Sequence, residues 1–126
     1  MLPAKELIAF IPTLDSARSR SFYEEVLGMK LVKDDGHALT FLSNGGKVRV
    51  SKVPPEFKPA GFTILGWAVD DIRKSVEAWK RAGVNFERFG FFEQDDLGVW
   101  TAPTGDKVAW FKDPDGNILS LSQHVD

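Results

Sequence analysis

Arg49 is the side chain in this sequence with the clearest capacity to bind a charged group. It lies in the stretch Lys47 to Val53, where valines alternate with polar residues, so a strand would turn Arg49 away from the apolar side. A guanidinium offers a planar fork of donors to a carboxylate or phosphate and keeps its charge. We therefore predict that Arg49 binds an anionic ligand. The alternative is a position at a rim or a structural ion pair with Glu6, Asp95 or Asp96.

Aromatic side chains could wall a cavity for such a ligand. The chain contains ten Phe, four Trp and one Tyr. Trp79 follows the apolar spacing of a helix and Trp67 that of a strand, which predicts that both belong to a core. The predicted cavity walls are Trp100, Trp110 and Phe41, with Phe10 either beside them or in the core.

For the other potentially reactive or binding side chains, the neighbouring sequence gives weaker indications of a function. Phe91 and Phe92 precede a run of acidic residues. They could form a lid over the cup or the apolar base of a solvent-exposed loop. Asp95 and Asp96 are interpreted as solvated loop charges. The two histidines, His37 and His124, are predicted to be surface residues. No Ser-His-Asp set or phosphate loop is visible, so nucleophilic and nucleotide chemistry are not indicated.

The elements that would position these residues occur twice in the same order. Asp15 is a good N-cap for a helix that Gly28 ends, and Asp70 or Asp71 plays the same part for a second helix that Gly83 ends. Asp70 and Gly83 follow Asp15 and Gly28 at equal intervals, which indicates an internal repeat. The expected helices cover 16–27 and the stretch after Asp71. The expected strands are 7–13, 29–33, 37–43, 47–53, 62–69, 84–89, 97–102, 108–112 and 118–123.

The fold class indicated by this order is α+β, with two tandem βαβββ modules and helices outside a cupped, mostly antiparallel sheet. The modules cover about 5–53 and 62–124 of one 126-residue domain and are joined by the proline-rich linker 54–61. Asp113-Pro114-Asp115-Gly116-Asn117 is predicted to be the tight turn of the last hairpin and not a calcium loop. Each sheet would leave one face open, and the open faces would form the cup.

Composition limits the possible partners and surroundings. A net charge of −2 without a run of basic residues argues against nucleic acid and anionic membranes as partners. The chain has no cysteine, which excludes disulfides and thiolate chemistry within it. The apolar part of the N-terminal stretch is too short for a signal peptide or a membrane span. We expect a cytoplasmic protein.

Three motifs carry a resemblance to a known family. They are Phe22-Tyr23-Glu24-Glu25-Val26-Leu27-Gly28-Met29, Gly66-Trp67-Ala68-Val69-Asp70-Asp71-Ile72 and Lys112-Asp113-Pro114-Asp115-Gly116-Asn117. In this order they resemble the vicinal oxygen chelate superfamily, which includes glyoxalases, bleomycin-resistance proteins and extradiol dioxygenases. The resemblance covers almost the whole chain. One fold of this kind hosts unrelated chemistries, so it implies the fold more strongly than an activity.

Metal-dependent members of that family hold an ion with His, Glu or Gln at four cavity-facing positions. The resemblance carries these positions onto Ile8, Arg49, Ile64 and Ser120, with Thr63 in place of Ile64 if a bulge shifts the strand. Two aliphatic groups, a cation and a hydroxyl do not suit a hard divalent ion. We therefore expect no metal and no cofactor, and we predict that these four positions contact a ligand.

The function expected from the sequence is metal-independent binding of an anionic or aromatic small molecule, as in bleomycin-resistance proteins. The alternatives are a metal-dependent lyase, isomerase or dioxygenase with misplaced ligands, and a structural module whose cup is filled by its own side chains. The resemblance also implies a homodimer, because two-module members commonly complete their cups across a dimer.

Overall fold

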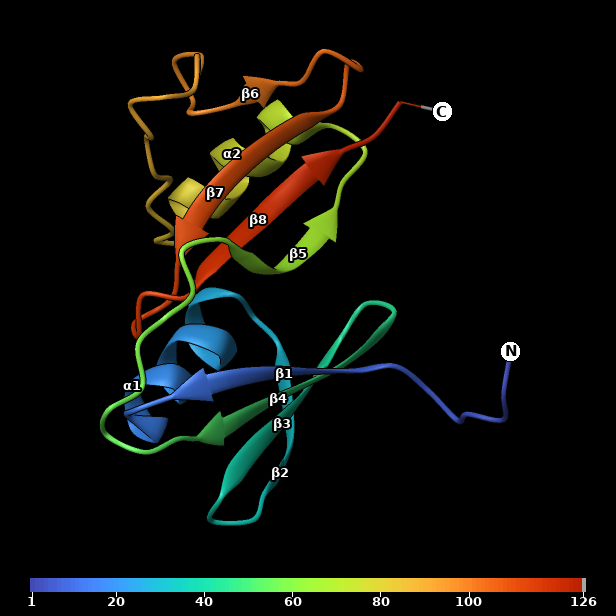
Figure 1. Ribbon diagram of the computed structural model, residues 1–126, viewed down its shortest axis with the longest axis vertical. Coiled ribbons are helices and arrows are strands. Elements are labelled where there is room, and N and C mark those ends of the chain that lie inside the picture. Colours follow the sequence, from blue (N-terminus) through green and yellow to red (C-terminus); the bar gives the residue numbers. More distant parts are fainter. Residues whose placement is uncertain (126) are drawn as a thin grey trace. The chain divides into compact units, whose positions relative to one another are not determined.

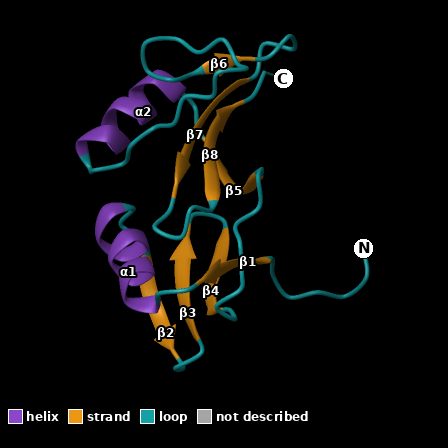
Figure 2. Cartoon of the chain, turned by 60° about the vertical axis from the view of Figure 1, so that its left-hand side comes forward, coloured by secondary structure: helices purple, strands orange, loops and turns teal. Residues whose placement is uncertain are grey.

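Two compact units make up the computed structural model, which describes residues 1–125. The first unit runs from Met1 to Lys58 and the second begins at Pro59, inside the predicted linker 54–61. Each unit contains a four-stranded sheet with a helix against one of its faces, as Figures 1 and 2 show. This is the predicted α+β fold with two βαβββ modules.

The first unit has strand order β1-β4-β3-β2, with β1 parallel to β4 and the other pairs antiparallel. Its elements are β1 (Ile8–Thr13), α1 (Ser16–Arg20), the π-helical turn η1 (Ser21–Val26), β2 (Lys30–Asp34), β3 (Ala38–Ser43) and β4 (Gly46–Lys52).

The helical segment of the first unit begins and ends where the sequence predicts. The Asp15 carboxylate accepts a hydrogen bond from Arg18 N at 3.1 Å, and Gly28 has φ of 72°, the left-handed conformation that terminates a helix. Between them the α-helix widens into a π-helical turn, which the periodicity does not reveal. Tyr23 on this turn is fully buried and packs against Phe41 of β3, which anchors the helix to the sheet.

The second unit has the corresponding order β5-β8-β7-β6, with β5 parallel to β8. Asp71, and not Asp70, caps its helix by accepting from Lys74 N at 3.2 Å, and Gly83 after the helix has φ of 112°. The elements are β5 (Thr63–Ala68), α2 (Ile72–Arg81), β6 (Trp100–Thr101), β7 (Lys107–Lys112) and β8 (Ile118–Gln123).

The segment between α2 and β7 departs most from the prediction. The strand expected at 84–89 is reduced to a single bridge between Phe86 and Phe111, and the one expected at 97–102 to the two residues of β6. The reason is that backbone groups of this segment bond to the side chain of Gln94, which accepts from Phe89 N at 2.8 Å and donates to Glu87 O at 3.0 Å. A local side chain has taken the place of a sheet partner.

The turn predicted at 113–117 is confirmed and is organised by one carboxylate. Asp113 is 5% exposed and accepts from Asp115 N, Asn117 N and Asn117 Nδ2 at 2.8–3.0 Å. Gly116 supplies the required positive φ of 86°. The turn therefore fixes the register of β7 against β8, the two strands that carry the candidate site.

Candidate functional site

Strand β7 separates two aromatic clusters, because successive side chains of a strand point to opposite faces. Phe111 faces helix α2 and is fully buried. Its ring lies 5.5 Å from that of Trp79, 5.6 Å from that of Phe86 and 6.4 Å from that of Trp67. This cluster belongs to the core of the second unit, and it contains both tryptophans that the spacing assigns to a core.

Trp110, the preceding residue of β7, carries the second cluster on the open face of the sheet. Phe92 stacks on its indole with 5.0 Å between ring centroids and 4° between ring planes. Phe89 meets the same indole edge-on at 5.4 Å, and Trp100 lies 6.0 Å away. Phe91 packs on Phe92 at 4.6 Å and is nevertheless 80% exposed. The arrangement presents an exposed phenyl ring beside a covered indole.

A pocket of about 250 Å³ opens beside this second cluster. Its walls are mostly aromatic, and Thr63 contributes a hydroxyl that accepts from Trp110 Nε1 at 3.1 Å. The volume lies below the usual range for drug-sized ligands, so the pocket suits a small molecule. Its lining consists of Gly61, Phe62, Thr63, Phe89, Phe91, Phe92, Trp110 and Ile118.

Trp100, which the sequence assigns to the same wall, lines a neighbouring polar hollow of about 360 Å³ together with Glu93, Gln94 and Asp95. It still contacts the aromatic pocket indirectly, because its ring lies 4.8 Å from that of Phe92. Contrary to the prediction from the sequence, Trp100 is therefore not part of the wall of the aromatic pocket, but it contacts a ring that is.

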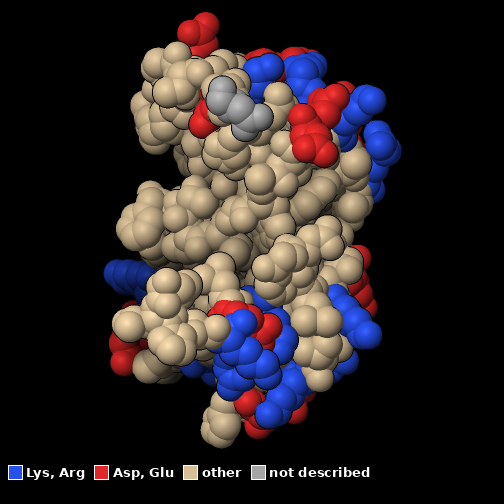
Figure 3. Space-filling model, turned by 90° about the vertical axis from the view of Figure 1, so that its right-hand side faces the viewer, with Lys and Arg blue, Asp and Glu red and all other residues tan. Residues whose placement is uncertain are grey.

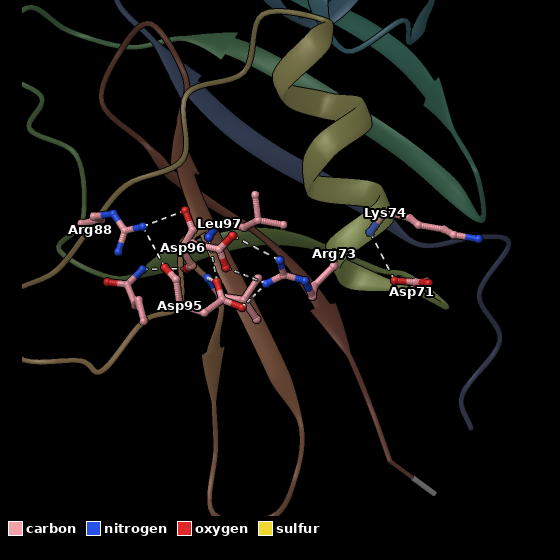
Figure 4. A network of polar contacts seen from close by, with 10 residues as sticks. Asp71, Arg73, Lys74, Arg88, Asp95, Asp96 and Leu97 are labelled. Atoms are coloured by element: carbon pink, nitrogen blue, oxygen red, sulfur yellow. Dashed lines mark hydrogen bonds and ion pairs between the residues drawn. The ribbon is translucent and has the colours of Figure 1, made fainter.

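Hydrogen bonds within the loop 87–99 hold its aromatic rings in place. Besides its bonds to residues 87 and 89, Gln94 donates to Gly98 O at 2.7 Å. Asp95 Oδ1 accepts from the backbone N–H groups of Leu97 and Val99, both at 2.9 Å. Arg88 donates to the carbonyl oxygens of Asp95 and Asp96, as Figure 4 shows. The loop is thus braced by its own polar groups.

Helix α2 stabilises the loop further through ion pairs with its acidic residues. Arg73 reaches Asp95 Oδ2 at 2.6 Å and Asp96 Oδ1 at 3.0 Å (Figure 4). The hydrogen bond from Arg73 lowers the pKa of the Asp96 carboxyl below its usual value. Both carboxylates are committed to structural ion pairs, which agrees with reading them as surface charges and not as an acid/base pair.

A β-bulge decides which residue of β5 faces the pocket. Pairing with β8 skips Ile64: Thr63 pairs with Ile118, and Leu65 with Leu119. Thr63 therefore lies on the open face, as the alternative placement anticipates, while Ile64 is the extra residue of the bulge and does not line the pocket. Further along this face, a Cβ built on Gly66 would lie 2.6 Å from Ser120 Oγ, so glycine leaves room for that hydroxyl.

In the first unit, Arg49 lies on the open face of β4, and its charge already has a partner. Its Nη2 is 2.8 Å from Asp35 Oδ2, and its Nη1 donates to Thr40 Oγ1 at 3.4 Å. None of the three partners considered from the sequence is used: Glu6 pairs with Lys47, and the two loop aspartates pair with Arg73. The guanidinium side chain keeps 32% exposure.

Asp35 is strongly held in its ionised form. Its carboxylate accepts from the backbone N–H groups of His37 and Ala38 at 2.9 and 2.8 Å, and these bonds, followed by the contact with Arg49, place its pKa well below the usual range. The hairpin between β2 and β3 and the charge of Arg49 are therefore stabilised by the same carboxylate.

Phe41 does not lie on the open face, so the expectation that it lines the cup is not met. It pairs with Val48, one residue before Arg49, and alternation turns both toward the helix. Phe41 is 0% exposed. The residue beside Arg49 on the open face is Thr40, while Phe10 on β1 pairs with Arg49 and is 64% exposed.

The residues at the four family positions do not fit a divalent ion. Ile8, which is 41% exposed on β1, and Ile64 have no donor atoms, Ser120 has one hydroxyl, and Arg49 is a cation. Within residues 1–125, no group of three or more His, Asp or Glu side chains is arranged to hold a metal ion.

Sequence reasoning missed one arrangement completely. Ser122, His124 and Asp106 form a hydrogen-bonded chain in the second unit, with separations of 2.8 and 3.1 Å. The prediction from the sequence that the chain has no Ser-His-Asp set is therefore wrong, because the three side chains are hydrogen-bonded in the fold. Spacing could not reveal it, because Asp106 comes from a different strand connection than the other two residues.

Charges of both signs lie next to one another on the face shown in Figure 3, and large parts of that face are uncharged. This distribution offers no extended basic patch there for a polyanion. No helix among residues 1–125 is long and apolar enough to cross a membrane.

Comparison with known proteins places the chain in a family. The family model described as the Glyoxalase/Bleomycin resistance protein/Dioxygenase superfamily matches residues 8–121. The chain belongs to this superfamily.

Individual relatives are more distant. A probable trivalent organoarsenical cleaving enzyme of Bacillus subtilis (strain 168) is 30% identical over 101 residues, which cover 79% of this chain and 66% of that protein, just under two thirds. A glyoxalase/bleomycin resistance protein/dioxygenase from Alicyclobacillus acidocaldarius superimposes with a TM-score of 0.71 at 18% identity, covering 97% of this chain and 92% of that one. A lactoylglutathione lyase from Agrobacterium tumefaciens gives 0.68 at 17% identity, covering 98% and 96%. At such identities the solved structures establish the fold alone.

Proposed function

We propose that this protein binds a small aromatic molecule in the pocket of its second unit without the help of a metal ion. The observation that carries the proposal is the aromatic pocket itself, in which Phe91 is 80% exposed while Phe92 is stacked on Trp110. An exposed phenyl ring on the rim of a pocket gains by stacking on a flat ligand, since aromatic pairs contribute about 0.5–1.5 kcal/mol beyond the burial of their area.

The alternative, a metal-dependent lyase, isomerase or dioxygenase, has less support from the residues. Relatives named as an organoarsenical cleaving enzyme and a lactoylglutathione lyase make it worth testing. It would require ligands at the family positions, where this chain has two isoleucines, an arginine and a serine. The poor fit of these residues favours binding over metal-assisted chemistry.

The test compares two carboxylates of the same carbon skeleton and charge, 2-naphthoate and its saturated counterpart decahydro-2-naphthoate, by isothermal titration calorimetry. Stacking on the aromatic wall predicts that the flat acid binds at least tenfold more tightly. Quenching of tryptophan fluorescence by 2-naphthoate provides a second measurement, because Trp110 lines the pocket. Equal affinities, or no binding of either acid, would overturn the proposal.

We further propose that the protein acts as a cytoplasmic homodimer, as members of this superfamily often do. A sedimentation equilibrium experiment over a wide concentration range should give twice the 14.0 kDa mass of the chain. A monomer mass at every concentration would refute this assembly without affecting the pocket.

A further inference from the structure

Three side chains at one end of the second sheet are linked in a line. Ser122 Oγ lies 2.8 Å from His124 Nε2, and His124 Nδ1 lies 3.1 Å from Asp106 Oδ2. Ser122 belongs to β8, His124 follows the same strand two residues later, and Asp106 comes immediately before β7. The two ring nitrogens therefore contact different partners, a hydroxyl on one side and a carboxylate on the other.

The protonation of these groups is set by what each can donate. Hydrogen bonds from Val125 N and then from His124 lower the pKa of Asp106, so its carboxylate is ionised at neutral pH and can only accept. Nδ1 of a neutral imidazole must then carry the ring proton. Nε2 is left with a lone pair, which accepts the hydrogen of the Ser122 hydroxyl. This is the tautomer that a general base needs.

The hydrogen-bonded chain of Ser122, His124 and Asp106 is fixed by backbone structure at both ends. Ser122 pairs with Ala68 of β5 and with Val108 of β7, so its position is fixed by strands on both sides. Asp106 Oδ1 accepts from Val125 N at 2.9 Å, which fixes the chain just after the imidazole. The turn before β7 packs against Val125, since a Cβ built on Gly105 would lie 3.3 Å from Val125 Cγ1.

We propose that Ser122 is a nucleophile for acyl transfer, with His124 as its general base and Asp106 as the residue that positions the imidazole. The arrangement has the roles of a serine hydrolase triad on an unrelated sheet. The substrate class is small aryl esters. Their aryloxide leaving groups are good, so the reaction demands less stabilisation of its intermediate than cleavage of an amide. The His124 side chain is 56% exposed, which gives a small ester access.

Ester cleavage takes place in two steps, acylation of Ser122 and hydrolysis of the acyl-serine. Ser122 Oγ attacks the ester carbonyl carbon while His124 Nε2 takes the hydroxyl proton. The bond between the carbonyl carbon and the aryl oxygen then breaks, and the phenol departs with that proton. Water attacks the acyl-serine with His124 again as base, which releases the carboxylic acid and restores the serine. Water is the sole co-reactant.

The experiment uses 4-nitrophenyl acetate as the probe on the full chain. Release of 4-nitrophenolate is followed by absorbance, the acetyl adduct by intact mass, and its location by peptide mapping. We expect the adduct on Ser122 and its loss in Ser122→Ala. His124→Gln should slow acylation about 10²–10³-fold, the usual contribution of a general base. Asp106→Asn should also slow it, because the amide can donate to the ring and favour the other tautomer.

Ser75→Ala is the matched control. Ser75 is also half-buried in the second unit, but its position on helix α2 lies outside the hydrogen-bonded line. The control should react like the wild type, and all variants should keep the wild-type melting temperature and 2-naphthoate affinity. An adduct on a lysine or the N-terminal amine, or unchanged acylation in His124→Gln, would overturn the proposal. The aromatic pocket is tested with substitutions at other residues, so a failure of the binding proposal would leave the acyl-transfer proposal unaffected.

Discussion

The two units share one plan but differ in the segment that comes after the helix. In the first unit the chain continues into an edge strand, β2, which pairs with β3 with one shift in register, and then into the hairpin that contains Asp35. In the second unit the corresponding stretch touches β7 through one bridge at Phe86 and through the two residues of β6. The loop between these contacts, 87–99, carries three phenylalanines over the open face.

This difference explains how one copy of a repeated fold can place aromatic rings over its open face. A full-length edge strand pairs the backbone groups on one of its sides with the neighbouring strand and leaves the open face uncovered. A loop that satisfies them with the side chains of Gln94 and Asp95 is free to place Phe89 and Phe92 around Trp110. In the first unit, by contrast, Arg49 stands beside a carboxylate that already neutralises it.

Removing the ring of Phe92, which stacks on Trp110, should have the largest effect on ligand binding. We expect Phe92→Ala to weaken 2-naphthoate binding by about 2–3 kcal/mol, because both apolar contact area and a stacking partner for the wall are lost. Phe92→Leu should lose less, since it keeps apolar volume. Phe10→Ala, which removes a 64%-exposed phenyl ring from the first unit, is the control. A larger loss in Phe10→Ala would move the site to the first unit.

Arg49 tests whether the first unit takes part in binding an acid. Because Arg49 already pairs with Asp35 and the pocket lies in the second unit, we predict that Arg49→Ala keeps the fold and leaves the 2-naphthoate affinity unchanged. Calorimetry on the wild type and on Arg49→Ala checks this, with neutral 2-naphthamide as the control ligand. A loss of about 1.5–3 kcal/mol for the acid alone, the value of a hydrogen bond to a charged group, would show that the guanidinium binds the carboxylate of the ligand, and Arg49→Lys should then recover part of it, since an ammonium lacks the fork.

Gln94 tests the loop that distinguishes the second unit. Gln94→Ala removes one acceptor and two donor interactions with backbone groups, so we expect the free energy of unfolding to fall by about 1–3 kcal/mol. The near-ultraviolet circular dichroism of the tryptophans should also weaken as Phe92 loosens from Trp110. Glu93→Ala, in the same loop, is the matched control. Equal stability of the two variants would show that the loop does not depend on this side chain.

The charge pair of the first unit predicts the smallest effect, a dependence of stability on acid. Because the pKa of Asp35 is lower in the folded protein, its ionisation stabilises the fold at neutral pH, and this contribution is lost as the pH falls below about 4. Asp35→Asn keeps an acceptor for the hairpin but no charge. Its melting temperature should therefore fall less than that of the wild type between pH 7 and pH 3. Parallel curves for the two proteins would contradict this.

The sequence predicts the fold well because the signals are local. Asp15 and Asp71 cap helices, Gly28 and Gly83 end them, and the turn after Asp113 needs no distant partner. The wall of the pocket is predictable where alternation decides it, as for Trp110, and the pairing of Phe41 with Val48 excludes Phe41 from the face of Arg49. The roles of Gln94 and Thr63 depend on a loop and a bulge, and the Ser122, His124 and Asp106 line depends on a contact between distant strand ends. Periodicity contains no information about such contacts.

The most direct test of metal-independent aromatic binding is a titration with 2-naphthoate before and after metal removal. The protein is purified without chelator or metal-affinity tag, its metal content is measured, and calorimetry is repeated after dialysis against EDTA. Our account predicts less than stoichiometric Fe, Mn, Ni or Zn and the same 2-naphthoate affinity in both preparations. Stoichiometric metal, or binding that disappears with EDTA and returns with one of these ions, would contradict it.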